Sequence, residues 1–240
     1  MFELRNVSKQ YQNNLSLQTI NFTVSTGEIV GVVGKSGAGK STLLKLLNLM
    51  EPPTSGELLL DGINTAELPK KIVRKEQQQM GMIFQKYNLL ENLTIYDNVA
   101  LPLKLLHRED SAKVNQLLEF VGMENKKDNY PVELSGGEQQ RVSIARALSR
   151  NPKWLFCDEA TSSLDEENTD MIIALLRKVH QEFRPTIFFV SHELETVKKL
   201  CERVLVLEEG KLIGDIKNDP TRFTLEELPY LTKVERSLRK

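Results

Sequence analysis

The sequence predicts an α/β fold with a mostly parallel sheet, an antiparallel β part near the N-terminus and an inserted helical subdomain. Continuous apolar runs at 29–33, 154–157 and 187–190 are typical of parallel strands that are covered on both faces. A helical apolar pattern at 172–183 follows the second run, and the strand signal disappears between about 87 and 150. Strands and helices therefore alternate around a helical insertion.

The antiparallel part is predicted from short segments in which apolar and polar residues alternate. Residues 2–4 and 22–24 have this pattern, which is typical of strands with one buried face. The apolar run 58–60 ends at Asp61-Gly62, a dipeptide that favours a hairpin turn. We therefore expect a small antiparallel sheet at this end of the chain.

Two further helices are predicted from apolar residues that repeat every three or four positions. One of them ends at Gly122, because glycine suits a helix C-terminal cap. We predict a single domain with an α/β core at about 1–86 and 151–216, a helical subdomain at about 87–150 and a tail at 217–240. The repeating positions are Val114, Leu117, Leu118 and Val121 in the first helix and Leu194, Val197 and Leu200 in the second.

Composition limits the class of protein. The 240 residues are 40% apolar and 27% charged, which excludes disordered, collagen-like and disulfide-framework proteins. The 32 Lys and Arg nearly balance the 33 Asp and Glu, so no global field favours nucleic acid or an anionic membrane, although a local basic patch is compatible with this balance. No apolar run approaches the roughly 18 to 20 residues that a membrane crossing requires.

The N-terminus and the cysteines predict the compartment. Glu3 and Arg5 stand where a signal peptide has its apolar segment, so we expect no export signal. Cys157 and Cys201 lie in apolar or helical surroundings without metal-type spacing, which indicates core thiols in a reducing compartment. We therefore expect a cytoplasmic location.

The segment GKSGAGKS, residues 34–41, matches the phosphate-binding pattern G-x-x-x-x-G-K-[ST]. It follows the predicted strand 29–33 and precedes a helical pattern at 43–47, which is the context that the motif requires. Its glycines allow a tight turn whose N–H groups point at phosphate oxygens, and the helix N-terminus adds positive potential. We expect Lys40 to contact the β- and γ-phosphates and Ser41 to offer its hydroxyl to Mg²⁺. A fortuitous Gly-rich turn is the alternative.

A second motif, LFCDE, ends at two acidic residues. Asp158 stands at the end of a predicted buried strand, where a carboxylate can hold hydrated Mg²⁺. Glu159 follows directly and can accept a proton from an attacking water molecule. The alternative is a strand end with two solvated acids.

A third motif, LSGGEQQ, begins a predicted helix. Ser135 can cap that helix, and Gly136 and Gly137 beside it leave backbone N–H groups open, which makes a second anion site. One phosphate chain does not need two such sites in one subunit. The motif therefore indicates that two subunits each contribute half of a shared site, with an ordinary helix-capping loop as the alternative.

Together these motifs make the sequence resemble the ATP-binding subunits of ABC transporters over about residues 1–216. The resemblance implies a P-loop NTPase core of the RecA-like type, and LSGGEQQ is similar to the ABC signature. It identifies Gln85 in GMIFQ with the Q-loop, Asp165 in SLD with the D-loop and His192 in FFVSHE with the switch histidine. Tyr11 takes the position of the aromatic residue that stacks on adenine.

The resemblance also implies the roles of the site residues toward ATP and Mg²⁺. Catalytic roles fall on Glu159, His192, Gln85 and Asp165, and metal binding on Ser41, Gln85 and Asp158. Nucleotide binding is implied for Tyr11, Gly34, Lys35, Ser36, Gly37, Ala38, Gly39, Lys40, Ser41, Thr42, Gln85, Ser135, Gly136, Gly137, Asp158 and His192.

Each of the carried-over residues also has a structural interpretation. Tyr11 can be a surface aromatic residue, Gln85 a polar group at a strand end, and His192 a structural histidine. His107 and His180 match no motif, so we expect both at the surface.

A finer resemblance is to the ATPases of methionine and related amino-acid importers. It rests on GMIFQKYNLLENLTIYDNVALPL, KKDNYPVELSGG and NPKWLFCDEATSSLD, and on Cys157 and Ala160 where many relatives have Leu and Pro. Export, lipoprotein-release and cell-division complexes share SGAGKSTLLKL and SGGEQQRV and are the competing branch. Methionine importers of this type usually carry a C-terminal regulatory domain, whereas this chain ends at Lys240. Either this regulation is absent, in which case we expect ATPase activity that does not respond to cytoplasmic methionine, or the substrate assignment is wrong.

The resemblance implies a motor subunit that works as a head-to-tail dimer at the cytoplasmic face of the membrane. Separate permease subunits would dock in a surface groove near Gln85, and an importer would also need an extracellular binding protein. A soluble ABC ATPase that acts on DNA or the ribosome is the alternative from another class. Those proteins tend to carry two ATPase units or a long coiled-coil insertion, and this sequence has neither, so we expect no nucleic-acid partner.

Overall fold

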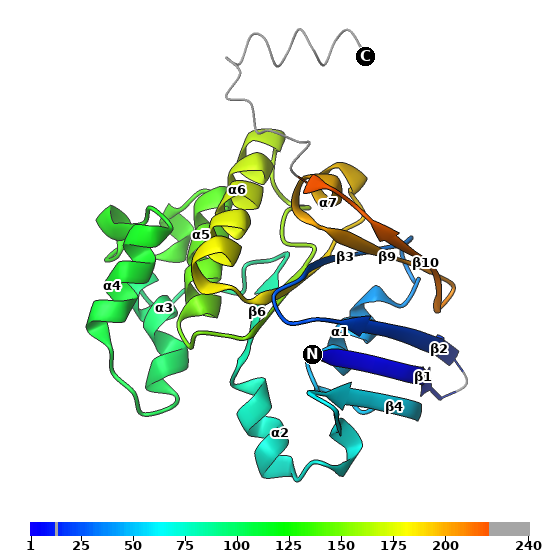
Figure 1. The fold of residues 1–240 in the computed structure, drawn as a ribbon. Coiled ribbons are helices and arrows are strands. Elements are labelled where there is room, and N and C mark those ends of the chain that lie inside the picture. Colours follow the sequence, from blue (N-terminus) through cyan, green and yellow to red (C-terminus); the bar gives the residue numbers. More distant parts are fainter. Residues whose placement is uncertain (13, 221–240) are drawn as a thin grey trace, which may run out of the picture.

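A computed structural model describes residues 1–12 and 14–220 and contains two sheets (Figure 1). The larger sheet is parallel except at one edge, where the two strands 203–208 and 211–217 pair antiparallel. The predicted fold class is therefore confirmed. The order of the larger sheet is β10 (Lys211–Lys217), β9 (Arg203–Glu208), β3 (Ile29–Val33), β8 (Thr186–Val190), β7 (Trp154–Asp158) and β6 (Met80–Phe84).

The smaller sheet is wholly antiparallel. Asp61 and Gly62 join its last two strands with φ angles of 50° and 81°. Two successive positive φ angles are typical of a two-residue hairpin turn, which confirms the turn predicted at this dipeptide. The order of the smaller sheet is β2 (Asn14–Val24), β1 (Phe2–Tyr11), β4 (Ser55–Leu60) and β5 (Ile63–Asn64).

The strands of the larger sheet send alternate side chains into two separate cores. In β8, Ile187 and Phe189 belong to one core, whereas Phe188 and Val190 belong to the other. The second core also contains the apolar side chains of α1 (Lys40–Leu47) and of the antiparallel sheet. Both faces of the sheet are thus covered, which is why its strands are continuous apolar runs.

Helices form the first core on the opposite face of the larger sheet (Figure 1). Gly122 follows the helix α4 (Ser111–Phe120) with a φ of 69°, which is typical of a glycine that ends a helix. Within the described residues, no helix combines the length and hydropathy of a membrane span. The helices are α3 (Ile95–Lys104), α4 (Ser111–Phe120), α5 (Gly136–Leu148), α6 (Glu166–Phe183) and α7 (Leu194–Leu200).

One helix was not expected from the sequence. The helix α2 (Lys70–Gln77) lies at the lower end of Figure 1, and none of its residues is buried. Its sequence KKIVRKEQ contains too few apolar residues to form a stripe, so periodicity gave no signal.

One expectation about a single residue was wrong. His180 is 9% exposed, because it lies in the last turn of α6 and its Nε2 is 2.7 Å from the carbonyl oxygen of Gly27. The helix predicted from Leu194, Val197 and Leu200 is present as α7, although Leu194 at its first position is 59% exposed. Cys157 and Cys201 are both free and buried, as predicted.

An aromatic cluster joins the two sheets and gives a first prediction. The ring of Phe2 in β1 lies 4.4 Å from that of Trp154 and 6.0 Å from that of Phe188. We expect Trp154→Ala to lower the free energy of unfolding by about 3–5 kcal/mol, since it leaves a large cavity between the sheets. Denaturant titration measures this loss. Val132→Ala is the control, since Val132 is 82% exposed and its loss should stay within about 0.5 kcal/mol; equal effects of the two changes would contradict the prediction.

Candidate functional site

The segment 34–41 consists of the loop between β3 and α1 and the first two residues of α1, and it includes positions whose backbone only glycine adopts easily. Gly37 and Gly39 have φ angles of 79° and 101°, in the region that L side chains rarely adopt. A Cβ atom at Gly34 would overlap the carbonyl oxygen of Leu207 in β9. The glycines thus permit both the turn and its close packing against the sheet.

Contacts from two other segments hold this loop in place. The N–H of Gly210, in the turn between β9 and β10, donates to the carbonyl of Ala38 (3.2 Å), and the carbonyl of Gly210 accepts from the N–H of Gln18 (2.7 Å). The hydroxyls of Ser16 and Thr42 are 2.8 Å apart. The antiparallel sheet therefore fixes the conformation of the phosphate loop.

Lys40 is a nearly buried cation at the start of α1. Its side chain is 8% exposed, and Nζ donates to the carbonyls of Gly34 (2.8 Å) and Lys35 (3.1 Å). No carboxylate within the described residues forms an ion pair with it. A desolvated ammonium with only neutral partners is well suited to bind an anion.

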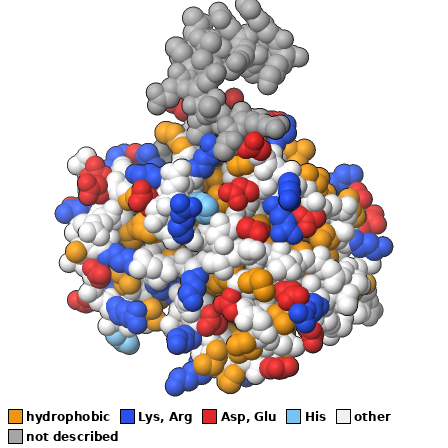
Figure 2. Space-filling model, in the orientation of Figure 1, with side chains coloured by type: hydrophobic (Ala, Val, Ile, Leu, Met, Phe, Trp, Pro, Cys, Tyr) orange, Lys and Arg blue, Asp and Glu red, His pale blue; other side chains and the backbone are white. Residues whose placement is uncertain are grey.

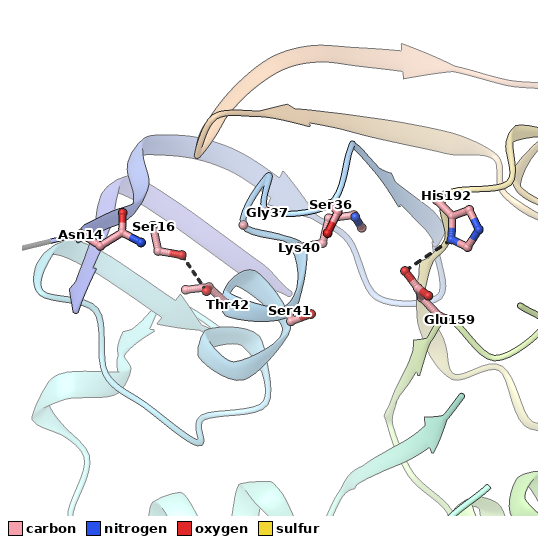
Figure 3. A pocket seen from close by; sticks show the side chains of 10 residues that line it. Asn14, Ser16, Ser36, Gly37, Lys40, Ser41, Thr42, Glu159 and His192 are labelled. Atoms are coloured by element: carbon pink, nitrogen blue, oxygen red, sulfur yellow. Dashed lines mark hydrogen bonds and ion pairs between the residues drawn. The ribbon is translucent and has the colours of Figure 1, made fainter. Parts of the chain in front are cut away.

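A cavity of about 680 Å³ lies in front of this loop, which is ample for a small-molecule ligand (Figure 3). Glu159, after β7, and His192, after β8, form its other wall. The structure thus brings residues from the first motif, the second motif and the histidine segment to one cavity. The lining residues are Asn14, Ser16, Ser36, Gly37, Gly39, Lys40, Ser41, Thr42, Glu159 and His192.

An adjoining cavity of about 430 Å³ contains the three residues predicted to bind a metal, Ser41, Gln85 and Asp158. Glu159 lines it too, so Ser41 and Glu159 border both cavities. A hydroxyl, an amide oxygen and a carboxylate are hard oxygen donors of the kind that Mg²⁺ accepts. The described residues contain no cluster of three or more His, Cys, Asp or Glu suited to a metal. The donor set therefore fits an ion that is also held by phosphate and water.

The carboxyl of Asp158 is electrostatically unfavourable as an anion. Burial is the main cause that raises its pKa above the ordinary value, and the neighbouring carboxylate of Glu159 raises it further, whereas the ammonium of Lys40 lowers it. A cation bound beside Asp158 would remove this penalty.

Glu159 has a strained backbone at the junction of the two cavities. Its φ is 51°, an uncommon conformation for a glutamate. Its N–H donates to Val190 (3.0 Å), and its carbonyl accepts from the hydroxyl of Ser162 (2.9 Å). Its Oε1 lies 3.4 Å from Nδ1 of His192 (Figure 3). The backbone is thus fixed on both sides while the carboxylate points into the cavity.

Ser135 is exposed and lines neither cavity. Its hydroxyl accepts from the N–H of Glu138, and the Glu138 carboxylate accepts from the N–H of Ser135 (3.0 Å), so the two form a capping box at the start of α5. Lys126 lies 2.6 Å from the same carboxylate. Within its own chain, Ser135 therefore does not line the cavity in front of the phosphate loop.

Two glycines of the same motif allow close packing. A Cβ at Gly136 would lie 2.6 Å from the hydroxyl oxygen of Tyr87, and one at Gly137 would overlap the side chain of Asn168. Asp165 caps α6 by accepting from the N–H of Asn168 (2.8 Å), and these hydrogen bonds lower the pKa of the Asp165 carboxyl. Asp165 lines neither cavity.

Tyr11 also lies outside the cavity lining. Its hydroxyl donates to Glu51 (2.6 Å), and the ammonium groups of Lys9 and Lys45 lie 5.1 and 5.8 Å from its ring centre. Its proposed stacking on adenine stays a prediction. Asn14, which does line the cavity, belongs to no motif that the sequence offered.

Comparison with known proteins identifies the family. Residues 17–162 match the family model described as ABC transporter.

The chain belongs to the ABC transporter family.

Its sequence is 46% identical over 222 residues to the methionine import ATP-binding protein MetN 1 of Shouchella clausii and 48% identical over 220 residues to MetN 1 of Listeria monocytogenes serovar 1/2a. These alignments cover 90% and 89% of this chain but only 64% and 65% of the two relatives. The dimeric ABC transporter cassette MJ0796 has a similar structure, with a TM-score of 0.81 and 33% identity, over 91% of this chain and 99% of that one. The same cassette has also been solved in a post-hydrolysis state bound to ADP and Pi.

This ABC chain has a further groove of about 480 Å³, next to the Gln85 segment. We call it the 84–88 groove; Phe84 and Asn88 line it, together with Gln77 of α2, Arg146 of α5 and Arg150, which follows α5. Met50, Met80, Met82 and Pro102 make much of its remaining surface apolar.

Arg146 fixes the shape of this groove in the ABC fold. It donates to the carbonyls of Asn88 (2.6 Å) and Tyr87 (2.7 Å), two successive residues with φ near 50°. Burial lowers the pKa of the Arg146 guanidinium. One side chain of the helical subdomain therefore holds the segment that follows Gln85.

The raised pKa of Asp158 predicts that removing its charge stabilises the ligand-free protein. A raised pKa means that the folded chain binds the proton more tightly than the unfolded chain. The ionised carboxylate therefore destabilises the fold above its folded pKa, and acidification removes that cost. We expect Asp158→Asn to raise the melting temperature at pH 8, with a gain that shrinks toward pH 4.

Thermal unfolding of both proteins across this pH range tests the prediction. Asp128→Asn, at an exposed position, is the matched control and should leave the melting temperature nearly unchanged. A less stable Asp158→Asn protein at pH 8 would contradict the assignment.

Proposed function

We propose that this chain is the ATP-binding and ATP-hydrolysing motor subunit of a membrane transporter that imports methionine or another amino acid. The observation that carries the proposal is the meeting of Lys40, Ser41, Gln85, Asp158 and Glu159 around two adjoining cavities. The names of the methionine-import relatives support the direction of transport and the class of substrate.

In this proposal the phosphate loop binds the β- and γ-phosphates of ATP. Backbone N–H groups of 34–41 and the ammonium of Lys40 provide the positive potential. Ser41, Gln85 and Asp158 would hold Mg²⁺, which would neutralise phosphate charge during transfer.

Hydrolysis then depends on residues at the ends of β7 and β8. Glu159 accepts the proton of the attacking water, because its carboxylate borders both the phosphate and the metal cavity. His192 lies within reach of Glu159 and of the γ-phosphate side of the cavity, so it positions the reacting groups. Gln85 and Asp165 complete the catalytic set that we infer. Gln85 acts from the metal cavity and Asp165 from the start of α6.

A second subunit supplies the missing half of the site. Ser135, Gly136 and Gly137 line neither cavity of their own chain, yet the first turn of α5 has amides without intrahelical acceptors. In a head-to-tail dimer these amides and Ser135 would bind the γ-phosphate of ATP held by the partner. Contacts to the γ-phosphate favour dimer closure with ATP over ADP.

Separate permease subunits receive this motion. The 84–88 groove combines apolar surface with Arg146 and Arg150 and adjoins Gln85, so it suits an amphipathic segment of a permease. The chain would then work as a peripheral subunit on the cytoplasmic face, and an importer would include an extracellular binding protein. Affinity capture of the native complex tests this: polytopic membrane proteins should co-purify, and ribosomal proteins or nucleic acid would reject transport.

The role of Glu159 gives a sharp prediction. Glu159→Gln should keep ATP binding but lower the hydrolysis rate by about 10²- to 10⁴-fold, since the amide retains the shape but cannot act as a base. Steady-state ATPase assays and nucleotide-binding titration measure the two effects. Glu182→Gln, at an exposed position of α6, is the control and should hydrolyse at the normal rate. Near-normal hydrolysis by the Glu159→Gln protein would refute the assignment.

The shared site predicts the behaviour of mixed dimers. Lys40→Ala and Ser135→Arg should each prevent a homodimer from trapping ATP, because every composite site carries a lesion. A mixed dimer combines both lesions in one site and leaves the other intact, so it should occlude about one ATP.

Labelled subunits must show that mixed dimers have formed before occlusion is compared. Occlusion no greater than that of either parent would overturn the shared-site model, because it would mean that Lys40 and Ser135 act within one chain.

A further inference from the structure

The exposed helix α2 carries a cluster of basic residues that the proposed function does not use. Lys70, Lys71, Arg74 and Lys75 are all exposed. None of their side chains makes an ion pair or a hydrogen bond within residues 1–12 and 14–220. We call these four residues the α2 cluster.

Some cations elsewhere in the chain have carboxylate partners, whereas others, such as Lys127 and Lys211, form no ion pair within the described residues. Lys104 lies 2.7 Å from Asp97, and Arg203 lies 2.6 Å from Asp215. The chain as a whole has a net charge of −1, so its surface offers enough acid for pairing. The α2 cluster is distinguished by its density, since four such cations lie within six consecutive residues of one exposed helix.

The helix α2 projects from the molecule and offers an exposed contact surface (Figure 1). No residue of α2 is buried, and Figure 1 shows it projecting from the lower end of the molecule. Ile72 within the helix and Ile63 in β5 are 38% and 53% exposed. In Figure 2 basic and hydrophobic side chains lie at the lower end of this face, with some acidic ones among them. Such a convex, basic and partly apolar surface fits a planar anionic partner.

The position of α2 gives the direction of that partner. Gln77, the last residue of α2, lines the 84–88 groove, which the proposed function assigns to the permease. The α2 cluster is therefore continuous with the surface that faces the membrane.

We propose that α2 contacts the anionic phospholipid headgroups around the permease, an inference that rests on the proposed function for the orientation of the chain. Lysine and arginine near an anionic bilayer are attracted to its surface, and this attraction weakens within a Debye length. The exposed isoleucines add apolar contact at the headgroup level. Lipid contact would thus help to orient the groove toward the permease.

Vesicle co-sedimentation with the full chain tests the proposal. The probes are vesicles of phosphatidylglycerol with phosphatidylcholine and vesicles of phosphatidylcholine alone. The test variant replaces Lys70, Lys71, Arg74 and Lys75 with Gln, which keeps helix propensity and removes the charge. We expect the unmodified chain to prefer the anionic vesicles, and the variant to bind them at least tenfold more weakly. Binding should also fall as salt is raised.

A matched control removes the same charge from exposed positions elsewhere. Lys127, Arg184, Lys211 and Lys217 are replaced together with Gln, and their loss should leave most of the anionic-vesicle binding intact. Partial variants of Lys70 with Lys71, and of Arg74 with Lys75, should each show an intermediate loss. They keep the test valid if the fourfold variant folds poorly.

Three results would overturn the proposal: equal binding to both kinds of vesicle, undiminished binding by the α2 variant, or an equal loss in the control. Loss of permease capture in detergent with unchanged vesicle binding would also overturn it, since α2 would then contact an acidic protein segment. The proposed function is judged separately by that capture. Lipid binding through α2 without any captured membrane protein would refute the transport role and leave the lipid contact standing.

Discussion

The organisation of the site depends on charges that the chain gathers at one edge of a parallel sheet without neutralising them. Lys40 is nearly buried and has only carbonyl partners, while Asp158 stays next to a second carboxylate. Such groups are unfavourable in the free chain and favourable once phosphate and a cation lie between them. The surrounding structure holds them apart: Gly210 anchors the phosphate loop, and Val190 fixes the backbone of Glu159.

The fold could be predicted where neighbouring residues determine the structure. The continuous apolar run of β8 and the glycine-rich loop are local patterns, so the strands, the loop and the family followed from the sequence. Features that depend on contacts between distant segments could not be predicted in this way. His180 is buried because Gly27 offers a carbonyl from across the fold, and α2 has no apolar stripe to reveal it. The hydroxyl of Tyr11 binds Glu51, and the stacking of its ring on adenine stays a prediction.

The signature glycines illustrate how one sequence pattern serves two physical demands. The sequence suggested that Gly136 and Gly137 leave amides open for an anion. The structure adds that a Cβ atom at either position would collide with the side chain of Tyr87 or Asn168 unless that side chain moved. Asn168 is bound by the carboxylate of Asp165, so the start of α5 packs directly on the capped start of α6. The signature segment and the segment capped by Asp165 are thus in direct contact through Asn168.

The left-handed backbone of Glu159 limits which substitutions at this position change the side chain without also changing the backbone. Because φ is 51° there, a β-branched replacement such as valine must either distort the turn or abandon the hydrogen bonds to Val190 and Ser162. Its phenotype then mixes altered geometry with lost chemistry. Asparagine and glycine tolerate this conformation, so only a narrow set of side chains at this position can separate the contribution of the carboxylate from that of the backbone.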